Sequence, residues 1–410
     1  MAVGPSVLPD FPVVPGIRLG VVEAGIKKVN RKDLVLIELA EGSVCSGVFT
    51  QNAFCAAPVT VSKKHLQGGG FAQKSPAYLV INTGNANAGT GAVGMQDALD
   101  TCQAIAQVTG VSPEQVLPFS TGVIGEKLPV EKIKQAIPAL KAALNANNWE
   151  NVAQGIMTTD TRPKGASRQV SYAGQVLTIN GVSKGAGMIR PNMATMLCFI
   201  GTDAKLPQAL ADQLVRELAD KSFNRVTVDG DTSTNDACML FASGQTDAPE
   251  ITLDHPDYPV FKSALTEVFV ELAQAIVRDG EGATKFVTIE VKQAQSSEEA
   301  LELAYTIAHS PLIKTALFAS DPNWGRILAA LGRARIDRLE LDKVTIFLGN
   351  VCIVEGGGKC ASYTEALGQA VMDQEEITIT LNLQRGDISE TVWTCDFSHD
   401  YVTINAEYRT

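Results

Sequence analysis

Short apolar runs bounded by polar residues or glycine alternate with longer amphipathic segments along most of the chain. Residues 34–39 and 77–82 are such apolar runs, and their length and flanks predict buried strands. Apolar residues recur every three or four positions over 95–107, which predicts a helix. The clearest helical pattern covers 259–278, where large apolar side chains form a single stripe. That stripe consists of Phe261, Leu265, Phe269, Leu272 and Ile276.

A second helical segment, 130–144, contains Pro138, which we expect to kink or split the helix because proline lacks the backbone N–H. Strand patterns return toward the C-terminus, interrupted at 296–301 by two serines and two acidic residues that predict a helix start. The mixed order of strands and helices, without a Pro-rich or Gly/Ser-rich linker, predicts an α+β fold of layered sheets. The late strands are expected at 286–291, 344–348, 377–383 and 390–397.

Composition excludes several classes of protein. Hydrophobic residues make up 45% of the 410 and charged residues 19%, which is enough apolar material for a packed core. The net charge of −11 comes without a basic cluster, so nucleic acid is not expected as a partner. No apolar run approaches the 18 residues of a membrane span, and the first residues do not resemble a signal peptide. Eight scattered cysteines without a CxxC pair indicate reduced, mostly buried thiols and hence a cytoplasmic protein.

Three motifs of metal or phosphate sites are incomplete. Cys395 and His399 are the one close Cys–His pair, and no second pair completes a zinc site. Residues 229–234 begin like a calcium loop, but glycine is missing at the sixth position and an acid at the twelfth. Residues 357–360 resemble the end of a phosphate-binding loop, but cysteine replaces the Ser or Thr, so we interpret them as a Gly-rich turn. We therefore expect no metal.

The segment 89–94 spells G-x-G-x-x-G between a predicted strand and a predicted helix, as in a dinucleotide-binding loop. The acidic residue required at the end of the next strand is absent, because Glu114 stands before that strand. The preceding residues 84–89 also lengthen the turn. A Gly/Asn-rich surface or site loop is therefore the better interpretation, and an acidic nucleotide-binding module is an alternative that a nucleotide titration would test.

The most informative segment places Ala194 and Thr195 between a Gly-rich stretch and the apolar run 196–200. A Thr hydroxyl is a weak nucleophile, and no histidine lies nearby in sequence to activate it. A Thr can use its own α-amine as base, but an internal Thr acquires that amine only if the preceding peptide bond is cut. The small Ala194 leaves room for such a cut. On residue pattern alone, a structural Thr at the start of a buried strand is the favoured alternative.

The residues 184–197, Lys-Gly-Ala-Gly-Met-Ile-Arg-Pro-Asn-Met-Ala-Thr-Met-Leu, resemble the self-cleavage signature of the glutamate N-acetyltransferase (ornithine acetyltransferase) family of arginine biosynthesis. Further blocks follow in the family's order from near residue 18 to the C-terminus, so the resemblance covers almost the whole chain. Arg190 before Pro191 and Cys198 within the strand are small departures. The further blocks are 47–52, 82–87, 120–125, 157–161, 278–285 and 320–326.

The resemblance implies a sandwich like that of N-terminal-nucleophile enzymes and self-cleavage between Ala194 and Thr195 into chains 1–194 and 195–410. It implies that Thr195 is the nucleophile and that Thr121 and Gly122 stabilise the oxyanion, although these two alone would suggest an ordinary turn. It also implies six substrate contacts: Thr161, Lys184, Thr195, Glu281, Asn405 and Thr410. Lys184 and Glu281 alone would be expected at the surface.

The implied reaction moves an acetyl group from N2-acetylornithine to glutamate through an acetyl-Thr195 ester, in a ping-pong exchange without metal or organic cofactor. Lys184 would meet the α-carboxylate that both substrates share, and the C-terminal tail with Asn405 and Thr410 would fold back over the site. The implied assembly is a cytoplasmic heterotetramer of two copies of each chain. Whether acetyl-CoA also serves as donor is open. The rival enzyme class is an N-terminal-nucleophile amidohydrolase or aminopeptidase, which passes the acyl group to water.

Overall fold

The structure is a computed structural model, and its contacts divide the chain into two units. The larger unit comprises Val7–Asn224 and Asp231–Ile276. The smaller unit comprises Met1–Ser6, Arg225–Gly230 and Val277–Thr410. The residues described are 2–5, 7–67, 71–72, 75–190 and 196–407.

The first sheet of the larger unit contains four strands in the order β1-β2-β4-β5. The strands β4 and β5 run parallel, and the other neighbouring pairs are antiparallel. The strand bounds are β1 Ile17–Val22, β2 Leu34–Leu39, β4 Ala77–Asn85 and β5 Val116–Val123. Both strands predicted from apolar runs, 34–39 and 77–82, are therefore confirmed, and all six residues of β2 are buried.

The second sheet of the larger unit has the order β3-β9-β8-β7-β6. Here β8 and β9 run parallel, and the remaining pairs are antiparallel. Its strands are β3 Val44–Phe49, β6 Lys164–Tyr172, β7 Gln175–Lys184, β8 Leu197–Thr202 and β9 Ala237–Ala242. The apolar run after Thr195 thus forms β8, in the middle of the sheet.

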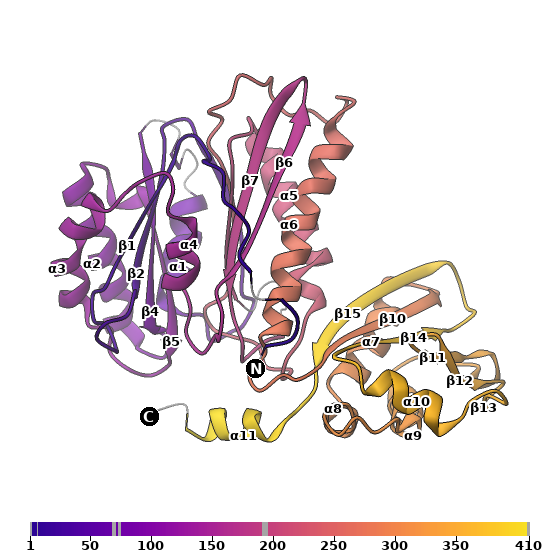
Figure 1. Ribbon diagram of the computed structural model, residues 1–410. Helices are drawn as coiled ribbons and strands as arrows, with labels where there is room; N and C mark the ends of the chain where they lie inside the picture. The colour runs from indigo at the N-terminus through magenta and orange to yellow at the C-terminus, as the bar shows by residue number, and fades with distance from the viewer. Residues whose placement is uncertain (1, 6, 68–70, 73–74, 191–195, 408–410) are drawn as a thin grey trace. The chain divides into compact units, whose positions relative to one another are not determined.

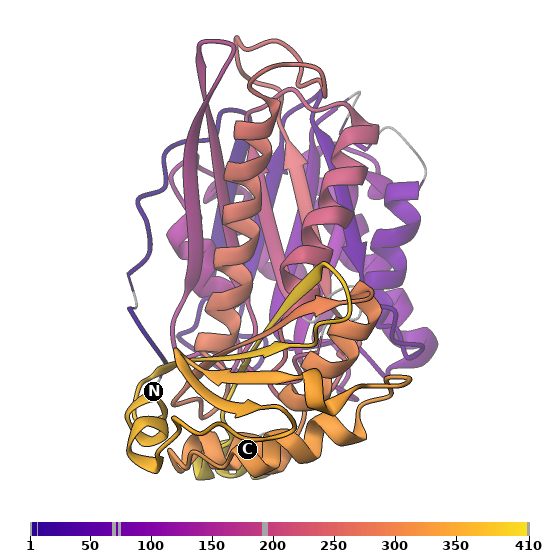
Figure 2. The same ribbon diagram turned by 90° about the vertical axis from the view of Figure 1, so that its right-hand side faces the viewer.

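The two sheets share one hydrophobic core, to which Ile37, Ile81 and Phe119 contribute from the first sheet and Phe199 and Phe241 from the second. Phe119 and Phe199 meet edge to face, with ring centroids 5.2 Å apart. Helices cover the outer faces, α2 and α3 on the first sheet and α5 and α6 on the second (Figures 1 and 2). The helices of this unit are α1 Ala57–Gln67, α2 Gly91–Thr109, α3 Val130–Ala142, α4 Trp149–Gly155, α5 Gln208–Lys221 and α6 Tyr258–Arg278, with 3₁₀ turns at Pro113–Gln115 and Phe223–Arg225. The larger unit is therefore an αββα sandwich.

The smaller unit is built on a six-stranded mixed sheet with the order β13-β12-β11-β14-β10-β15. Its strands are β10 Phe286–Ala294, β11 Thr345–Leu348, β12 Val351–Glu355, β13 Gly358–Lys359, β14 Glu376–Asn382 and β15 Ile388–Cys395. Its helices are α7 Ser297–Ala308, α8 Pro311–Phe318, α9 Trp324–Arg333, α10 Glu365–Met372 and α11 His399–Ala406, with a 3₁₀ turn at Leu341–Lys343. Together the two units confirm the predicted α+β class.

Local predictions are largely confirmed, with one correction. Ser296 caps α7 by accepting the N–H of Glu299 at 3.2 Å, as its position before two acids predicted. The segment 130–144 is not split, because α3 runs continuously through Pro138. Ile133 and Ile137 are fully buried against the first sheet, and this packing outweighs the loss of one helical hydrogen bond.

The eight cysteines are all free thiols, and six of them are buried. Among the described residues, no helix combines the length and the apolar character needed to cross a membrane.

Candidate active site

Lys184, Met196 and Asp236 come together at one end of the second sheet, where β7 ends and β8 and β9 begin. This end of the strands is called the edge of the sheet below. Lys184 ends β7 and pairs with Leu197 at the start of β8. The parallel register of β8 and β9 pairs Leu197 with Ala237, and the Ala237 N–H donates to the Met196 carbonyl at 2.9 Å. Residues 191–195, including Ala194 and Thr195, lie outside the described residues. In sequence, the expected nucleophile directly precedes Met196.

Lys184 connects this edge to the first sheet. Its side chain is largely buried, and its ammonium donates to Thr121 Oγ1 at 3.2 Å. Two of the residues implied by the resemblance, 63 positions apart in sequence, are thus in contact. No described residue accepts a hydrogen bond from the Thr121 hydroxyl, so its single proton is available to another oxygen.

Thr121 and Gly122 lie within β5, which runs on to Val123, and not in a turn after a strand ending near Phe119 as the sequence suggested. The strand continues because its pairing with β4 persists through an irregularity at Gly84 and Asn85. Gly122 has φ +134°, and a Cβ there would come within 2.3 Å of the Gly84 carbonyl carbon. Only glycine fits this close approach of two backbones.

Asp160 forms the centre of a buried ionic cluster beside Lys184. Its carboxylate accepts from Lys164 Nζ at 2.5 Å, from the Gly185 N–H at 2.7 Å and from the Thr158 N–H at 2.8 Å. Burial would raise the pKa of Asp160, but the charges of Lys164 and Lys184 and these hydrogen bonds outweigh it and hold the pKa well below its ordinary value. Asp160 is therefore an anion that fixes the backbone next to Lys184.

Asp236 is the second buried aspartate at this edge, and its surroundings have the opposite effect. Burial raises its pKa well above the ordinary value, and a hydrogen bond from Ser233, the charge of Lys184 and the Met196 N–H oppose this only in part. Its Oδ2 is buried and has no hydrogen-bond partner among the described residues. Sequence reasoning did not single out either aspartate, although Asp160 lies in the block 157–161.

A network of amides holds the strand ends in place. Ser120 Oγ donates to Asn82 Oδ1 at 2.5 Å, and the Asn235 amide donates to the carbonyls of Ser120, at 2.9 Å, and Ala86, at 2.6 Å. Asn87, which follows β4, donates to the Gly94 carbonyl at 2.8 Å and so ties the G-x-G-x-x-G segment to the loop after that strand. The blocks 82–87 and 120–125 therefore supply the scaffold of the site as well as the Thr121–Gly122 pair.

The remaining residues implied by the resemblance are distributed over both units. Thr161 is exposed in the larger unit, directly after Asp160. In the smaller unit, Asn405 on α11 donates to Glu281 Oε2 at 2.8 Å. Glu281 is buried, whereas its position between glycines alone predicted exposure. Thr410 lies outside the described residues.

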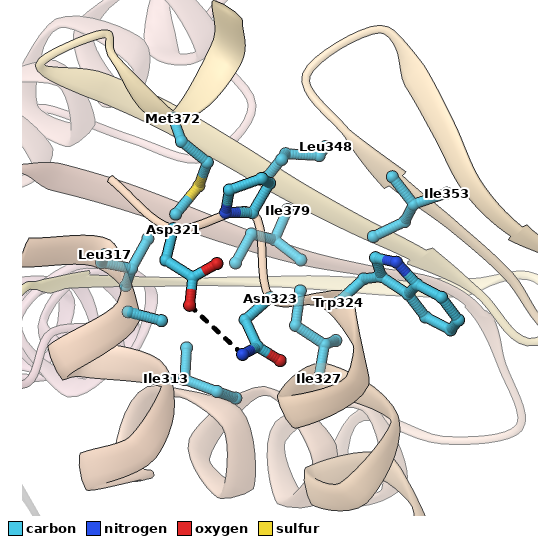
Figure 3. Close-up of a pocket in the computed structure, with 12 residues that line it drawn as sticks. Ile313, Leu317, Asp321, Asn323, Trp324, Ile327, Leu348, Ile353, Met372 and Ile379 are labelled. Atoms are coloured by element: carbon cyan, nitrogen blue, oxygen red, sulfur yellow. Dashed lines mark hydrogen bonds between the residues drawn. The ribbon is translucent and has the colours of Figure 1, made fainter. Parts of the chain in front are cut away.

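The block 320–326 in the smaller unit has a structural role. Figure 3 shows Asp321, Asn323 and Trp324 beside apolar side chains, including Ile313 and Met372, with Asn323 Nδ2 donating to Asp321 Oδ2 at 3.2 Å. The pocket there holds about 20 Å³, space for about one water molecule and too little for an amino-acid substrate. The block therefore shapes the turn between α8 and α9.

One cluster of possible metal ligands was not foreseen from the sequence. The donor atoms of Cys352, Glu355 and Cys360 lie within 4.8 Å of one another across the hairpin of β12 and β13. The Gly-rich turn at 356–357, with positive φ at both residues, brings the two cysteines together. These are three donors, one fewer than structural zinc takes, and Glu355 is exposed.

Comparison with known proteins identifies the family. The ArgJ family model matches residues 18–410. The arginine biosynthesis bifunctional protein ArgJ of Pseudomonas syringae pv. tomato is 58% identical over 100% of both chains. The crystal structure of ArgJ from Bacillus halodurans is 36% identical, with a TM-score of 0.48, and the match covers 50% of this chain and 95% of that one. The ornithine acetyltransferase of Mycobacterium tuberculosis, crystallised with ornithine, is 30% identical, with a TM-score of 0.38, over 44% of this chain and 94% of that one.

A family match over nearly the whole chain, together with relatives of high identity at full length, confirms the resemblance derived from the sequence blocks. The chain belongs to the ArgJ family.

Proposed function

We propose that the chain is a glutamate N-acetyltransferase of arginine biosynthesis, which transfers the acetyl group of N2-acetylornithine to glutamate through Thr195. Family membership supports the enzyme class. The observation that supports the proposal most strongly is the contact between Lys184 and Thr121, because Lys184 pairs with Leu197 at the start of β8.

Activation begins with self-cleavage. Thr195 Oγ attacks the Ala194 carbonyl, the peptide nitrogen leaves in an N-to-O acyl shift, and water hydrolyses the resulting ester. The products are the Ala194 carboxylate and a Thr195 with a free hydroxyl and a free α-amine. An α-amine has an ordinary pKa of about 7.7–8.0, so it can accept a proton near neutral pH.

In the transfer reaction, the Thr195 α-amine takes the hydroxyl proton while Oγ bonds to the acetyl carbon of N2-acetylornithine. The oxyanion forms beside the Thr121 hydroxyl and the Gly122 N–H. The Lys184 ammonium occupies a lone pair of Thr121 Oγ1, which leaves the hydroxyl proton to donate and polarises it. The C–N bond to ornithine then breaks, and the α-ammonium protonates the departing amine.

Glutamate completes the cycle when its amine attacks the acetyl ester and releases Thr195. The Lys184 charge suits the α-carboxylate that is common to ornithine and glutamate. The further substrate contacts of this proposal are Thr161, Glu281, Asn405 and Thr410. We also propose a cytoplasmic heterotetramer with two copies of each fragment, and acetyl-CoA as a second donor to be tested.

A denaturing gel and an exchange assay test the proposal together. The purified chain should run as fragments 1–194 and 195–410, and Edman sequencing of the second should begin Thr-Met-Leu-Cys. The cut protein should transfer a labelled acetyl group from N-acetylornithine to glutamate. Acetyl-CoA is assayed in parallel as an alternative acetyl donor. Thr195→Ala should remain intact and inactive, whereas Thr266→Ala on α6 should behave like the wild type. Release of acetate without transfer would identify the rival amidohydrolase, and an intact, active wild-type chain would refute the mechanism.

A further inference from the structure

The hairpin of β12 and β13 lies at one end of the smaller unit's sheet (Figure 1). It contains Cys352 and Glu355 on β12, and Cys360 follows β13 directly. The outer strand β13 consists of only two residues, both exposed, and the ladder between the two strands contains two residue pairs. A hairpin with so few pairs has little stability of its own, so a ligand that links its two arms would stabilise it.

A tight turn brings Cys360 back to β12. Gly356 and Gly357 have φ values of +57° and +75°, and a two-residue turn with positive φ at both positions suits the twist of a hairpin. The pairing extends beyond β13, because the Cys360 N–H donates to the Ile353 carbonyl at 3.1 Å. The backbone therefore holds Cys360 level with the middle of β12.

An irregularity in β12 places Cys352 with the other two donors. Along a regular strand, Cys352 and Glu355 would point to opposite faces because they are three positions apart. The pairing of β12 with β11 shifts register at Ile353, which is left between two paired residues. Such a bulge changes the direction of nearby side chains, and the donor atoms of Cys352 and Glu355 lie within 4.8 Å of each other.

The separations of the donor atoms resemble those of ligands around one metal ion. All three donor atoms lie within 4.8 Å of one another, and Cys360 Sγ is 4.0 Å from Glu355 Oε2. Two sulfurs bound to a tetrahedral ion at about 2.3 Å are about 3.8 Å apart, so each pair of donors has to close by only about 1 Å. A disulfide would join the sulfurs at about 2.0 Å and would give the carboxylate no role.

The cluster has donors suited to a cation and no cationic side chain of its own. Among the described residues, Glu355 forms no salt bridge. The Lys359 ammonium, the nearest basic group in sequence, lies over the Tyr363 ring, 5.2 Å from its centroid. The Ser362 hydroxyl is 3.2 Å from Cys360 Sγ and orients this sulfur. Glu355 is exposed, so an ion can reach the cluster from solvent.

We propose that Cys352, Glu355 and Cys360 bind a thiophilic divalent cation, with Zn²⁺ as the ion that suits these donors best, and that the ion links the two arms of the hairpin. Zn²⁺ takes both thiolate and carboxylate ligands in tetrahedral sites. Binding converts the two thiols to thiolates and releases two protons. Three protein donors leave the fourth position open to water. The site is separate from the acetyl transfer proposed above, which involves none of these three residues.

The test is a titration of the purified protein with Zn²⁺ after treatment with a chelator and a reductant. We expect one ion per copy of the chain with a Kd of about 1 μM or tighter, weaker than in structural sites with four donors. Cys352→Ser, Cys360→Ser and Glu355→Gln should each weaken binding at least about 10-fold, the loss that follows even when a group that orients a ligand is removed. The matched control, Cys55→Ser, replaces the other half-exposed cysteine and should bind Zn²⁺ like the wild type.

Amide hydrogen exchange locates the ion. At a Zn²⁺ concentration near the wild-type Kd, exchange over 351–360 should slow in the wild type and in Cys55→Ser, and much less in Glu355→Gln, whose exposed side chain can change without disturbing the fold. Equal Zn²⁺ affinity of the wild type and a variant with both Cys352→Ser and Cys360→Ser would overturn the inference. A protein that binds no Zn²⁺ and instead forms a Cys352–Cys360 disulfide with hydrogen peroxide would also overturn it, since the two thiols would then be a redox pair.

Discussion

Replacing Asp160 by asparagine removes the anion from a buried cluster that contains two lysines. The side chains of Asp160 and Lys164 are almost completely buried, and their charged atoms lie 2.5 Å apart. Removing one partner of a buried ion pair costs about 3–5 kcal/mol, because the other charge stays in the interior without compensation. The backbone N–H groups of Thr158 and Gly185 also lose a charged acceptor. We therefore expect Asp160→Asn to lower the free energy of unfolding by an amount at the upper end of this range.

The assay must report on the larger unit alone. Trp149 is buried in its core, and the chain's other tryptophans, Trp324 and Trp393, lie in the smaller unit. Fluorescence unfolding of a Thr195→Ala chain with Phe at 324 and 393 follows Trp149 without interference from cleavage. At about 2–4 °C per kcal/mol, the melting temperature should fall by about 10 °C.

The pH dependence of the same measurement has a definite sign. The pKa of Asp160 is lower in the folded than in the unfolded chain. Its contribution is therefore complete above the unfolded value of about 3.9 and disappears as the pH falls toward the folded value. The difference between the parent and Asp160→Asn should be constant from pH 6 to 8 and shrink below about pH 4.

The matched control is Glu267→Gln, which removes an exposed partner of Arg168 at 2.8 Å in the same unit. Exposed pairs contribute at most about 1 kcal/mol, so this variant should unfold almost like its parent. Adding Lys164→Met to Asp160→Asn should recover part of the loss, because one unpaired charge is then removed. A cost for Asp160→Asn no larger than that of Glu267→Gln would refute the argument.

Two further predictions concern the chemistry. Thr121→Ala should lower kcat by about 10²–10³ with little change in KM for N-acetylornithine, and a raised KM with unchanged kcat would show a ground-state contact instead. Lys184→Met should reduce kcat/KM for N-acetylornithine and glutamate by similar factors of about 10–100, as for one charge-assisted hydrogen bond. A loss confined to glutamate would mean that Lys184 binds the side-chain carboxylate.

The elements of this fold were predictable where burial imposed a simple pattern. The strand β2 is apolar except at Glu38 because both of its faces are buried, and α6 shows its stripe because one face packs on a sheet. Which strands pair with each other was not predictable. The parallel neighbours β8 and β9 are separated by α5 and a long loop, and no local pattern specifies which strands become neighbours.

The site was predictable only through the family blocks. Residue pattern alone favoured a structural Thr195 and an exposed Lys184, whereas the structure buries Lys184 against Thr121. That contact depends on how two sheets pack, which spacing in the sequence does not encode. For Asp236 the sequence contains one weak indication of a buried position, because this acid directly precedes the apolar run 237–242. That Met196 is its neighbour follows only from the pairing of β8 with β9.

The opposite environments of Asp160 and Asp236 give these two buried carboxyl groups different charges. Three donors, one of them the Lys164 ammonium, keep Asp160 ionised, whereas burial favours the neutral form of Asp236. The charge of Lys184 acts on both carboxyl groups and lowers the pKa of each. Asp160 can therefore hold the backbone N–H groups of Thr158 and Gly185 as an anion, whereas a neutral Asp236 carboxyl can also donate a proton.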